Sequence, residues 1–352
     1  MLKPRPCIES LSSYLSPIVS REGLCLDLNE NAAGCSPRVL ARLRSLTSTD
    51  VSRYPLREDG ERRVAAHLGV APEQVLLTNG VDDALALLFS AYLTTGDELL
   101  FADPTFVMYP MLGQAYGATL IRVKSAENLE LPVDGLLQHI SPRTRVIAIA
   151  NPNNPTGLVA PRADLLRIVQ AAPNAVVLID EAYFEFCGQT LIGDLVSYPN
   201  LFVTRTFSKV YGLAGLRLGV LTGAAKQIGF IRRFCPPFNV NVAALACLEA
   251  ALTDQAFVRD YVEQMKRSCR QIETLCEDLA LHYWPSSTNF VLIRIDKNAA
   301  SFADAMQRRG VIVRDMSASP GCEGCIRITA ATNEQIALVL QAMRESMAEL
   351  RK

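Results

Sequence analysis

Seven short apolar runs between residues 74 and 223 constrain the fold of this chain more than any other feature of its sequence. They are QVLLT (74–78), ELLFA (98–102), TLIRV (119–123), RVIAIA (145–150), VVLID (176–180), LFVTR (201–205) and RLGVLTG (217–223). Several carry apolar residues at consecutive positions, which indicates strands covered on both faces. Helix-like stretches, such as 82–93 and 161–172, lie between some of them. The sequence therefore predicts an α/β fold with a mostly parallel, seven-stranded sheet.

The pattern changes after residue 222. A long helix that alternates polar and apolar residues is predicted over about 255–280, and apolar runs follow at 289–295, 311–314 and 325–329, with a helix at 301–310 and another at the C-terminus. This indicates a smaller α+β domain, whereas the first 30 or so residues show little periodicity. We expect an N-terminal arm (1–30), a large domain (31–245) and a small domain (246–352).

Charge and cysteine content exclude several classes of function. The net charge of −1 argues against a basic nucleic-acid-binding surface. The N-terminus lacks a signal-peptide core and no window resembles a membrane span, so we expect a cytoplasmic protein without nucleic-acid or membrane partners. The ten cysteines are scattered, which favours buried thiols. Cys322 and Cys325 form the only C-x-x-C and histidine occurs three times, so no metal site is expected.

Polar residues follow four of the apolar runs at the point where each run ends. NGVDDAL follows the first run, NPNNPTG the fourth, DEAY completes the fifth and TFSK the sixth. In open parallel sheets, ligands bind beyond the carboxyl ends of the strands. We therefore expect one site to be formed there by Asn79, Asn154, Asp180, Tyr183, Thr206, Ser208 and Lys209.

These residue types suit pyridoxal 5′-phosphate. A lysine amine can form a Schiff base with its aldehyde, and a buried carboxylate can pair with its pyridinium nitrogen. Tyrosine and asparagine can bond the phenolic oxygen, while hydroxyls, an arginine and a helix N-terminus can hold the phosphate. Each residue alone has an ordinary explanation, since a lysine after a strand is usually solvated and Asn, Pro and Gly dominate turns. Their combination in this order favours the cofactor site.

The sequence resembles the fold-type-I, pyridoxal-phosphate-dependent aminotransferases of class I and II over nearly its whole length. Two segments, DEAYFEF and IVRD…CIRIT, narrow the resemblance towards the histidinol-phosphate branch of that family. The motifs that carry the resemblance are LDLNEN (26–31), RYP (53–55), PNNPTG (152–157), DEAYFEFC (180–187), TFSKVYGLAGLRLG (206–219) and GVIVRDMSASPGCEGCIRIT (310–329).

The resemblance implies roles for the cofactor residues. Lys209 would be the Schiff-base lysine and proton carrier, and Asp180 would pair with the pyridine nitrogen. Asn154 and Tyr183 would bond the phenolic oxygen, and Phe106 would stack on the ring where the family often has tyrosine. The cofactor phosphate would be held by Val81, Asp82, Thr206, Ser208 and Arg217.

The resemblance also implies roles towards substrate and a partner subunit. Tyr54 would reach the cofactor phosphate of the other subunit of a homodimer. Asn29 would border the substrate, Tyr14 would close the pocket, and Arg314 and Arg327 would bind its anionic groups. The loop NENAAG (29–34) departs from the family pattern on the substrate side.

The expected reaction exchanges an amino group between histidinol phosphate and 2-oxoglutarate, in histidine biosynthesis. Three alternatives stay open: a threonine-phosphate decarboxylase, an aromatic amino acid aminotransferase, and a non-catalytic ligand sensor on the same fold. The retained Lys209 and the lack of a DNA-binding appendage disfavour the sensor.

Overall fold

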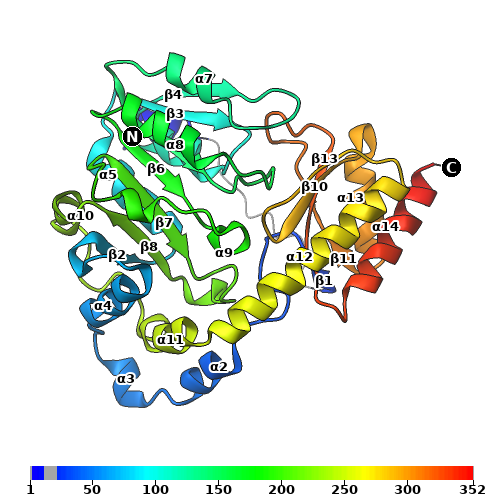
Figure 1. Cartoon of the computed structure of the whole chain (residues 1–352), viewed down its shortest axis with the longest axis horizontal. Coiled ribbons are helices and arrows are strands. Elements are labelled where there is room, and N and C mark those ends of the chain that lie inside the picture. Colours follow the sequence, from blue (N-terminus) through cyan, green and yellow to red (C-terminus); the bar gives the residue numbers. More distant parts are fainter. Residues whose placement is uncertain (1, 12–21, 352) are drawn as a thin grey trace.

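The computed structural model describes residues 2–11 and 22–351, and its main element is a seven-stranded sheet (Figure 1). Six neighbouring pairs order the strands as β2-β8-β7-β6-β5-β3-β4. Only β8 runs antiparallel to its neighbours. The predicted mostly parallel sheet is therefore confirmed, with bounds β2 Val75–Thr78, β3 Glu98–Asp103, β4 Thr119–Lys124, β5 Thr144–Ala150, β6 Val176–Asp180, β7 Leu201–Thr206 and β8 Gly219–Gly223.

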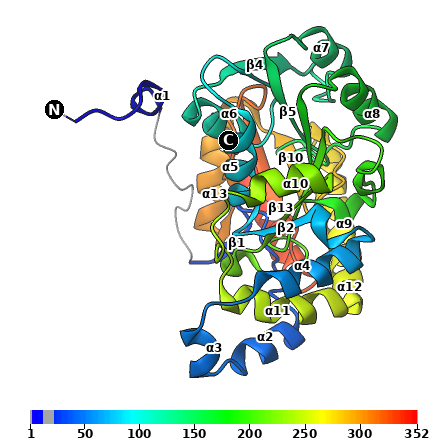
Figure 2. The ribbon, with the colours of Figure 1, turned by 90° about the vertical axis from the view of Figure 1, so that its left-hand side faces the viewer.

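Both faces of this sheet are covered, which explains the consecutive apolar positions. In β3, Leu99 and Phe101 belong to one core cluster and Leu100 to another, because successive side chains of a strand point to opposite faces. One face packs on α5 (Val81–Tyr92), α6 (Met108–Ala115) and α10 (Ala225–Arg232), as Figure 2 shows. The other packs on α7 (Val133–Gln138) and α8 (Arg162–Ala171).

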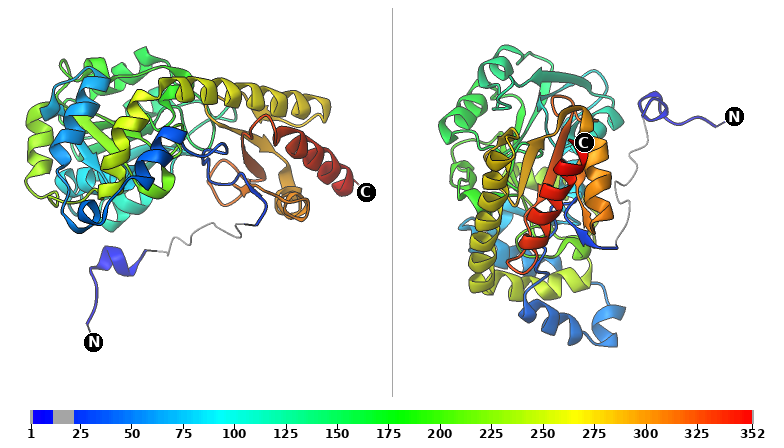
Figure 3. Two further views of the ribbon diagram at one scale, coloured as in Figure 1. Left: turned by 90° about the horizontal axis from the view of Figure 1, so that it is seen from below. Right: turned by 90° about the vertical axis from the view of Figure 1, so that its right-hand side faces the viewer.

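A smaller part of the chain forms an antiparallel sheet of order β12-β13-β10-β9. Its strands are β9 Tyr283–Trp284, β10 Phe290–Arg294, β12 Arg314–Asp315 and β13 Cys325–Thr329, and its helices are α12 Gln255–Asp278, α13 Ala299–Arg308 and α14 Ile336–Leu350. Figure 3 shows α12 and α14 lying along this sheet. The prediction of a single strand over 311–314 is wrong in one respect, because two strands cover this stretch. Arg314 belongs to β12 in this sheet, whereas β11 (Val311–Ile312) lies outside it and pairs with a strand near the N-terminus.

The partner of β11 is β1 (Leu24–Cys25), in a region where the sequence predicted only an arm. Leu24 N donates to Gly310 O at 2.8 Å, Leu26 N to Ile312 O at 2.8 Å, and Thr329 N to Leu26 O at 2.9 Å. The last residues of the predicted arm are thus built into the small part, while the boundaries 31–245 and 246–352 stay predictions. Tyr14 lies outside the described residues.

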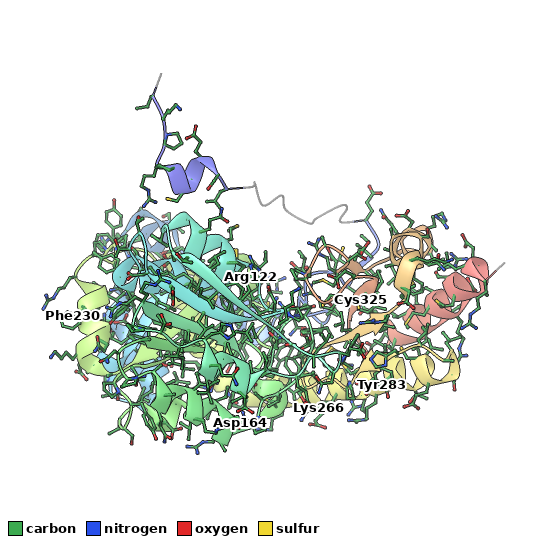
Figure 4. The ribbon with its side chains drawn as sticks, turned by 90° about the horizontal axis from the view of Figure 1, so that it is seen from above. Arg122, Asp164, Phe230, Lys266, Tyr283 and Cys325 are labelled. Atoms are coloured by element: carbon green, nitrogen blue, oxygen red, sulfur yellow. The ribbon has the colours of Figure 1, made fainter. Side chains whose placement is uncertain are left out.

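The remaining helices are α1 Pro6–Glu9, α2 Pro37–Arg44, α3 Ser48–Ser52, α4 Arg57–Leu68, α9 Phe184–Cys187 and α11 Val242–Thr253. Of these, α2, α3 and α4 pack on α11, while α1 contacts α6 and α9 contacts α12. Figure 4, seen from above, shows the two parts side by side, with Arg122 of β4 on the large part and Cys325 of β13 on the small one. Among residues 2–11 and 22–351, no helix combines the length and apolarity needed to cross a membrane.

Candidate active site

The sheet register brings the predicted polar residues to one edge. Asp180, the last residue of β6, lies opposite Ala150, the last of β5, and opposite Thr204 of β7. Asn154 follows β5 and Lys209 follows β7 by three residues. The carboxyl ends of neighbouring parallel strands therefore supply the candidate site, as their sequence positions predicted.

Asp180 is a buried carboxylate held by hydroxyl groups. Tyr109 Oη donates to its Oδ2 at 2.9 Å, and Thr204 Oγ1 donates to its Oδ1 at 2.8 Å. Burial raises the pKa of Asp180, and the hydrogen bonds from Thr204, Tyr109 and the Ala182 amide oppose that rise. The sequence did not single out Tyr109 or Thr204, since a tyrosine and a threonine among apolar residues resemble ordinary core and strand residues.

Lys209 points its amine at the N-terminal segment. Nζ donates to Leu28 O at 2.8 Å. Burial lowers the pKa of Lys209 to about 8; the charge of Arg327 acts in the same direction, and Glu30 and Asp82 oppose it. A sizeable fraction of the amine is therefore neutral near physiological pH, and the neutral amine is the nucleophilic form.

Two further hydrogen-bonded groups involve predicted site residues: Asn29 with Tyr183, and Arg327 with Asn154. Asn29 Nδ2 donates to Tyr183 Oη at 2.8 Å. Arg327 Nη1 donates to Asn154 Oδ1 at 2.6 Å, and its Nη2 to Asp27 O at 2.6 Å. These bonds join the small part, the N-terminal segment and the large part. Burial raises the pKa of Tyr183, and the positive charge of Arg327 opposes that rise.

Asn29 is held in an unusual backbone conformation. Its φ is 56°, a left-handed value that asparagine adopts more readily than most residues. Thr329 fixes it twice: Asn29 N donates to Thr329 Oγ1 at 3.1 Å, and that hydroxyl donates to Asn29 Oδ1 at 3.1 Å. Asn289 Nδ2 donates to Asn29 O at 3.2 Å. Strand β13 thereby positions the amide that reaches Tyr183.

The residues predicted to hold a phosphate gather at the start of α5. Its N-cap, Gly80, has a φ of 80° and supplies no side chain to cap the helix. A Cβ at Gly80 would lie 2.6 Å from Arg217 Nη2, which donates to Asp82 Oδ2 at 2.7 Å. Gly219 of β8 pairs with Thr78 and with Thr206, so the ends of β2 and β7 lie close together. Val81, Asp82, Thr206, Ser208 and Arg217 are thus brought to one place.

Three predicted residues lie at the margins. Phe106 packs edge-on against Tyr109, with ring centroids 5.7 Å apart. Arg314 of β12 sits directly opposite Arg327 in the register and, within the described ranges, its side chain makes no hydrogen bond or ion pair. Tyr54 is 77% exposed and stacks on Phe238 at 4.3 Å. Within one copy of the chain, no described contact links Tyr54 to Lys209 or to the residues around it.

The sequence left two further features open, a buried carboxylate beside Asp180 and the role of Cys322 and Cys325. Glu181, next to Asp180, is buried and binds Arg205 Nη2 at 2.7 Å and the Leu191 amide at 2.7 Å. Glu181 holds the segment that follows β6. In the sequence, only its position directly after Asp180 in DEAY could have pointed to it. Cys322 and Cys325 are buried free thiols, and burial raises their pKa to about 12 and about 11.

Comparison with known proteins gives one family. A model of aminotransferase class I and II matches residues 21–343. Histidinol-phosphate aminotransferase 1 of Bacillus anthracis is 35% identical over 91% of this chain and 88% of its own length. Histidinol-phosphate aminotransferase 2 of Pseudomonas fluorescens is 37% identical, with the same two coverages.

Solved structures agree on the fold. Histidinol-phosphate aminotransferase from Sinorhizobium meliloti, in complex with pyridoxal-5′-phosphate, superposes with a TM-score of 0.89 at 26% identity, over 99% of each chain. L-threonine-O-3-phosphate decarboxylase from Porphyromonas gingivalis superposes with a TM-score of 0.81 at 23% identity, over 94% of this chain and 100% of that one. The second likeness bears on the fold alone.

Proposed function

Because the chain belongs to the class I and II aminotransferases, we propose that it transfers an amino group between histidinol phosphate and 2-oxoglutarate. The observation that carries this proposal is the likeness to several histidinol-phosphate aminotransferases, at 35–37% identity over about 90% of the chain. The keto product would be imidazole-acetol phosphate and the amino product glutamate. Pyridoxal 5′-phosphate is the cofactor, as in the family.

The residues at the site fit this cofactor. Because Gly80 has no Cβ, the Arg217 guanidinium lies close against the start of α5, which no side chain caps and where a phosphate is favoured. Asp180 offers a buried carboxylate that no lysine or arginine pairs with among the described residues. Lys209 offers an amine whose pKa is lowered to about 8. When bound, the cofactor supplies an electron sink for the substrate's Cα.

The protein's own side chains then divide the work. We assign Lys209 Nζ to covalent attachment of the cofactor and to carrying the proton removed from Cα. Asp180 holds the pyridine nitrogen, and Asn154 and Tyr183 hold the phenolic oxygen. Val81, Asp82, Thr206, Ser208 and Arg217 bind the cofactor phosphate, and Phe106 covers the ring.

Arg327 and Arg314 bind the substrate's anions in this proposal. Arg327 binds the carboxylate of glutamate through the guanidinium edge that bonds Asn154 and Asp27 O here. Arg314, which faces it in the register and has no described partner, binds the phosphate of histidinol phosphate. Asn29 borders the substrate through its bond to Tyr183.

We also propose a homodimer with shared sites. Segments 51–56 and 234–238 are held together by the bonds of Arg57 to Cys235, Pro236 and Asn239 and by the stacking of Tyr54 on Phe238. They expose five hydrophobic residues that a partner subunit would cover: Val51, Tyr54, Leu56, Phe234 and Phe238. Exposed apolar patches of this kind mark protein interfaces. Tyr54 would reach the partner's cofactor phosphate, which explains its distance from Lys209 within one chain.

The test is a pair of half-reactions with phosphorylated and unphosphorylated amines. Purified protein is mixed with histidinol phosphate, histidinol or phenylalanine, and the change in cofactor absorbance is followed. Wild type should prefer histidinol phosphate. Arg314→Ala should lose about 2–3 kcal/mol of transition-state binding with it and little with the other two, since one charged contact is removed.

Arg327→Ala serves as the matched control, because it should weaken the glutamate half-reaction as well. Equal rates of wild type with all three amines, or an equal loss with each in Arg314→Ala, would contradict the substrate assignment. Release of carbon dioxide from threonine phosphate would instead identify a decarboxylase.

A further inference from the structure

The buried carboxylate of Asp180 is stabilised by neutral hydrogen-bond donors and not by a cation. In the described part of the chain, no lysine, arginine or histidine nitrogen lies within ion-pair distance of it. Its two oxygens instead accept one hydroxyl each, from Tyr109 and Thr204. A carboxylate buried without a cation is costly, and hydrogen bonds to the charged form are what lower that cost.

Tyr109 is fixed where it can serve only this carboxylate. It is the second residue of α6, fully buried, in the core cluster that contains Leu99, Phe101 and Ala148. Phe106 packs on its ring edge-on. Burial, and then the charge of Asp180, raise the pKa of Tyr109 well above its usual value, so its hydroxyl stays protonated and donates.

We propose that Tyr109 is a positioning residue, which together with Thr204 orients the Asp180 carboxylate and keeps it ionised for the cofactor's pyridine nitrogen. This inference rests on the proposed function, because it takes Asp180 as the cofactor's ring partner. Tyr109 acts through Asp180 and not on the substrate. Thr204 Oγ1 fixes Oδ1 and Tyr109 Oη fixes Oδ2, so the plane of the carboxylate is set from both sides.

The chain offers a matched pair of tyrosine-to-phenylalanine variants. Tyr109→Phe removes the hydroxyl on Asp180. Tyr92→Phe removes a hydroxyl that donates to Gln227 Oε1 at 2.7 Å, and Tyr92 packs against the same core cluster. Both proteins are prepared without cofactor and titrated with pyridoxal 5′-phosphate at several pH values. The readouts are the cofactor dissociation constant and the thermal unfolding temperature of the cofactor-free protein.

Tyr109→Phe should weaken cofactor binding by about tenfold to a hundredfold at acidic pH, the scale of a hydrogen bond to a charged group. The sign follows from the lost donor: without it, the pKa of Asp180 rises further, and the neutral carboxyl cannot pair with a pyridinium. The dissociation constants of the variant and of wild type should become more similar as the pH rises and Asp180 ionises. Tyr92→Phe should bind the cofactor as wild type does.

Thr204→Val provides an independent arm, since it removes the donor on the other oxygen at nearly constant volume. Thr204→Val should show the same pH-dependent loss of cofactor affinity. It therefore tests the proposal even if Tyr109→Phe does not fold. Cofactor affinity equal to wild type at every pH, or a lower unfolding temperature with no change in affinity, would overturn the proposal. Affinity needs no substrate, so wild type that fails to turn over histidinol phosphate would count against the proposed function alone.

Discussion

The amine of Lys209 has a pKa lowered to about 8 by burial and by Arg327, against 10.5 for the ordinary group. Below about pH 8 the folded protein therefore carries mostly ammonium, which cannot attack an aldehyde, and above it mostly amine. The rate at which cofactor-free protein takes up pyridoxal 5′-phosphate covalently should rise through about pH 8 and then level off. Stopped-flow absorbance measures this rate.

Lys209→Ala is the control for that experiment, because it should still bind the cofactor but retain no label after borohydride reduction. A rate that climbs only towards the ordinary value of 10.5 would show that burial does not act on the amine as described. Borohydride labelling of another lysine in wild type would overturn the assignment of Lys209.

A second prediction at the scale of single residues concerns Gly80. Its φ is 80°, and an added Cβ would lie 2.6 Å from Arg217 Nη2, so Gly80→Ala must displace the arginine. We expect cofactor affinity to fall at least about tenfold, since one charge-assisted phosphate contact is lost. Fluorescence titration with pyridoxal 5′-phosphate measures it.

Gly69→Ala separates this collision from backbone strain. Gly69 also has a positive φ, 70°, but a Cβ added there would have no neighbouring atom within 4 Å. This variant should lose about 1–2 kcal/mol of stability, the usual cost of a left-handed residue other than glycine, and keep its cofactor affinity. Similar affinity losses in both variants would mean that strain, and not Arg217, explains the effect at Gly80.

Among the elements, α4 depends on a buried carboxylate. Glu61 binds Arg57 Nε at 3.1 Å and Arg232 Nη2 at 2.8 Å, and accepts from the Leu77 amide at 3.1 Å, so it joins α4 to α10 and β2. Glu61→Ala removes the carboxylate that pairs with both arginines and accepts from the Leu77 amide, and leaves the arginines only neutral acceptors. We expect a loss of about 3–5 kcal/mol in the free energy of unfolding, measured by urea denaturation.

Asp278→Ala is the matched control. This variant breaks the ion pair between Asp278 and Arg344, whose side chains are 51% and 56% exposed, respectively. It should lower the free energy of unfolding by less than about 1 kcal/mol. Comparable losses in the two variants would show that the Glu61 cluster contributes no more than a surface pair.

The sequence predicted the large elements because each carries a sustained pattern. The runs of β2, β3, β6, β7 and β8 are buried at every position, so a short, nearly continuous apolar run marked each of them in the sequence. By contrast, β1 has two residues, too few for any pattern, and its pairing with β11 depends on contact between distant parts of the chain. The strand ends indicated where Lys209 and Asp180 lie, whereas the bond from Tyr109 to Asp180 could not be predicted, because it depends on how α6 packs beside β3 and β4.

At the scale of the whole molecule, the proposed dimer makes a prediction about complementation. Lys209→Ala and Tyr54→Ala should each be inactive, one for want of the amine and the other because a partner's phosphate contact is missing. Mixed under conditions that exchange subunits, they form heterodimers in which one site has both wild-type residues. Transamination activity should then return, as measured in the histidinol phosphate assay.

Subunit exchange is verified in the same sample with differently tagged chains. Exchange without recovered activity would place Tyr54 in its own subunit's site or outside any site. Its 77% exposure within one chain already argues against the former.

The bonds between residues 24–29 and strands β11 and β13 have a consequence for how the protein is made. Asn29 is held by Thr329, 300 positions later, and β1 needs β11. At about 5–20 residues per second, a ribosome adds the later partners roughly 15–60 s after the earlier ones. Throughout that interval Leu28 O and Asn29 cannot be fixed beside Lys209 and Tyr183. A nascent chain can therefore complete its large sheet, with the residues proposed to hold the cofactor, well before it can complete the side proposed to bind substrate.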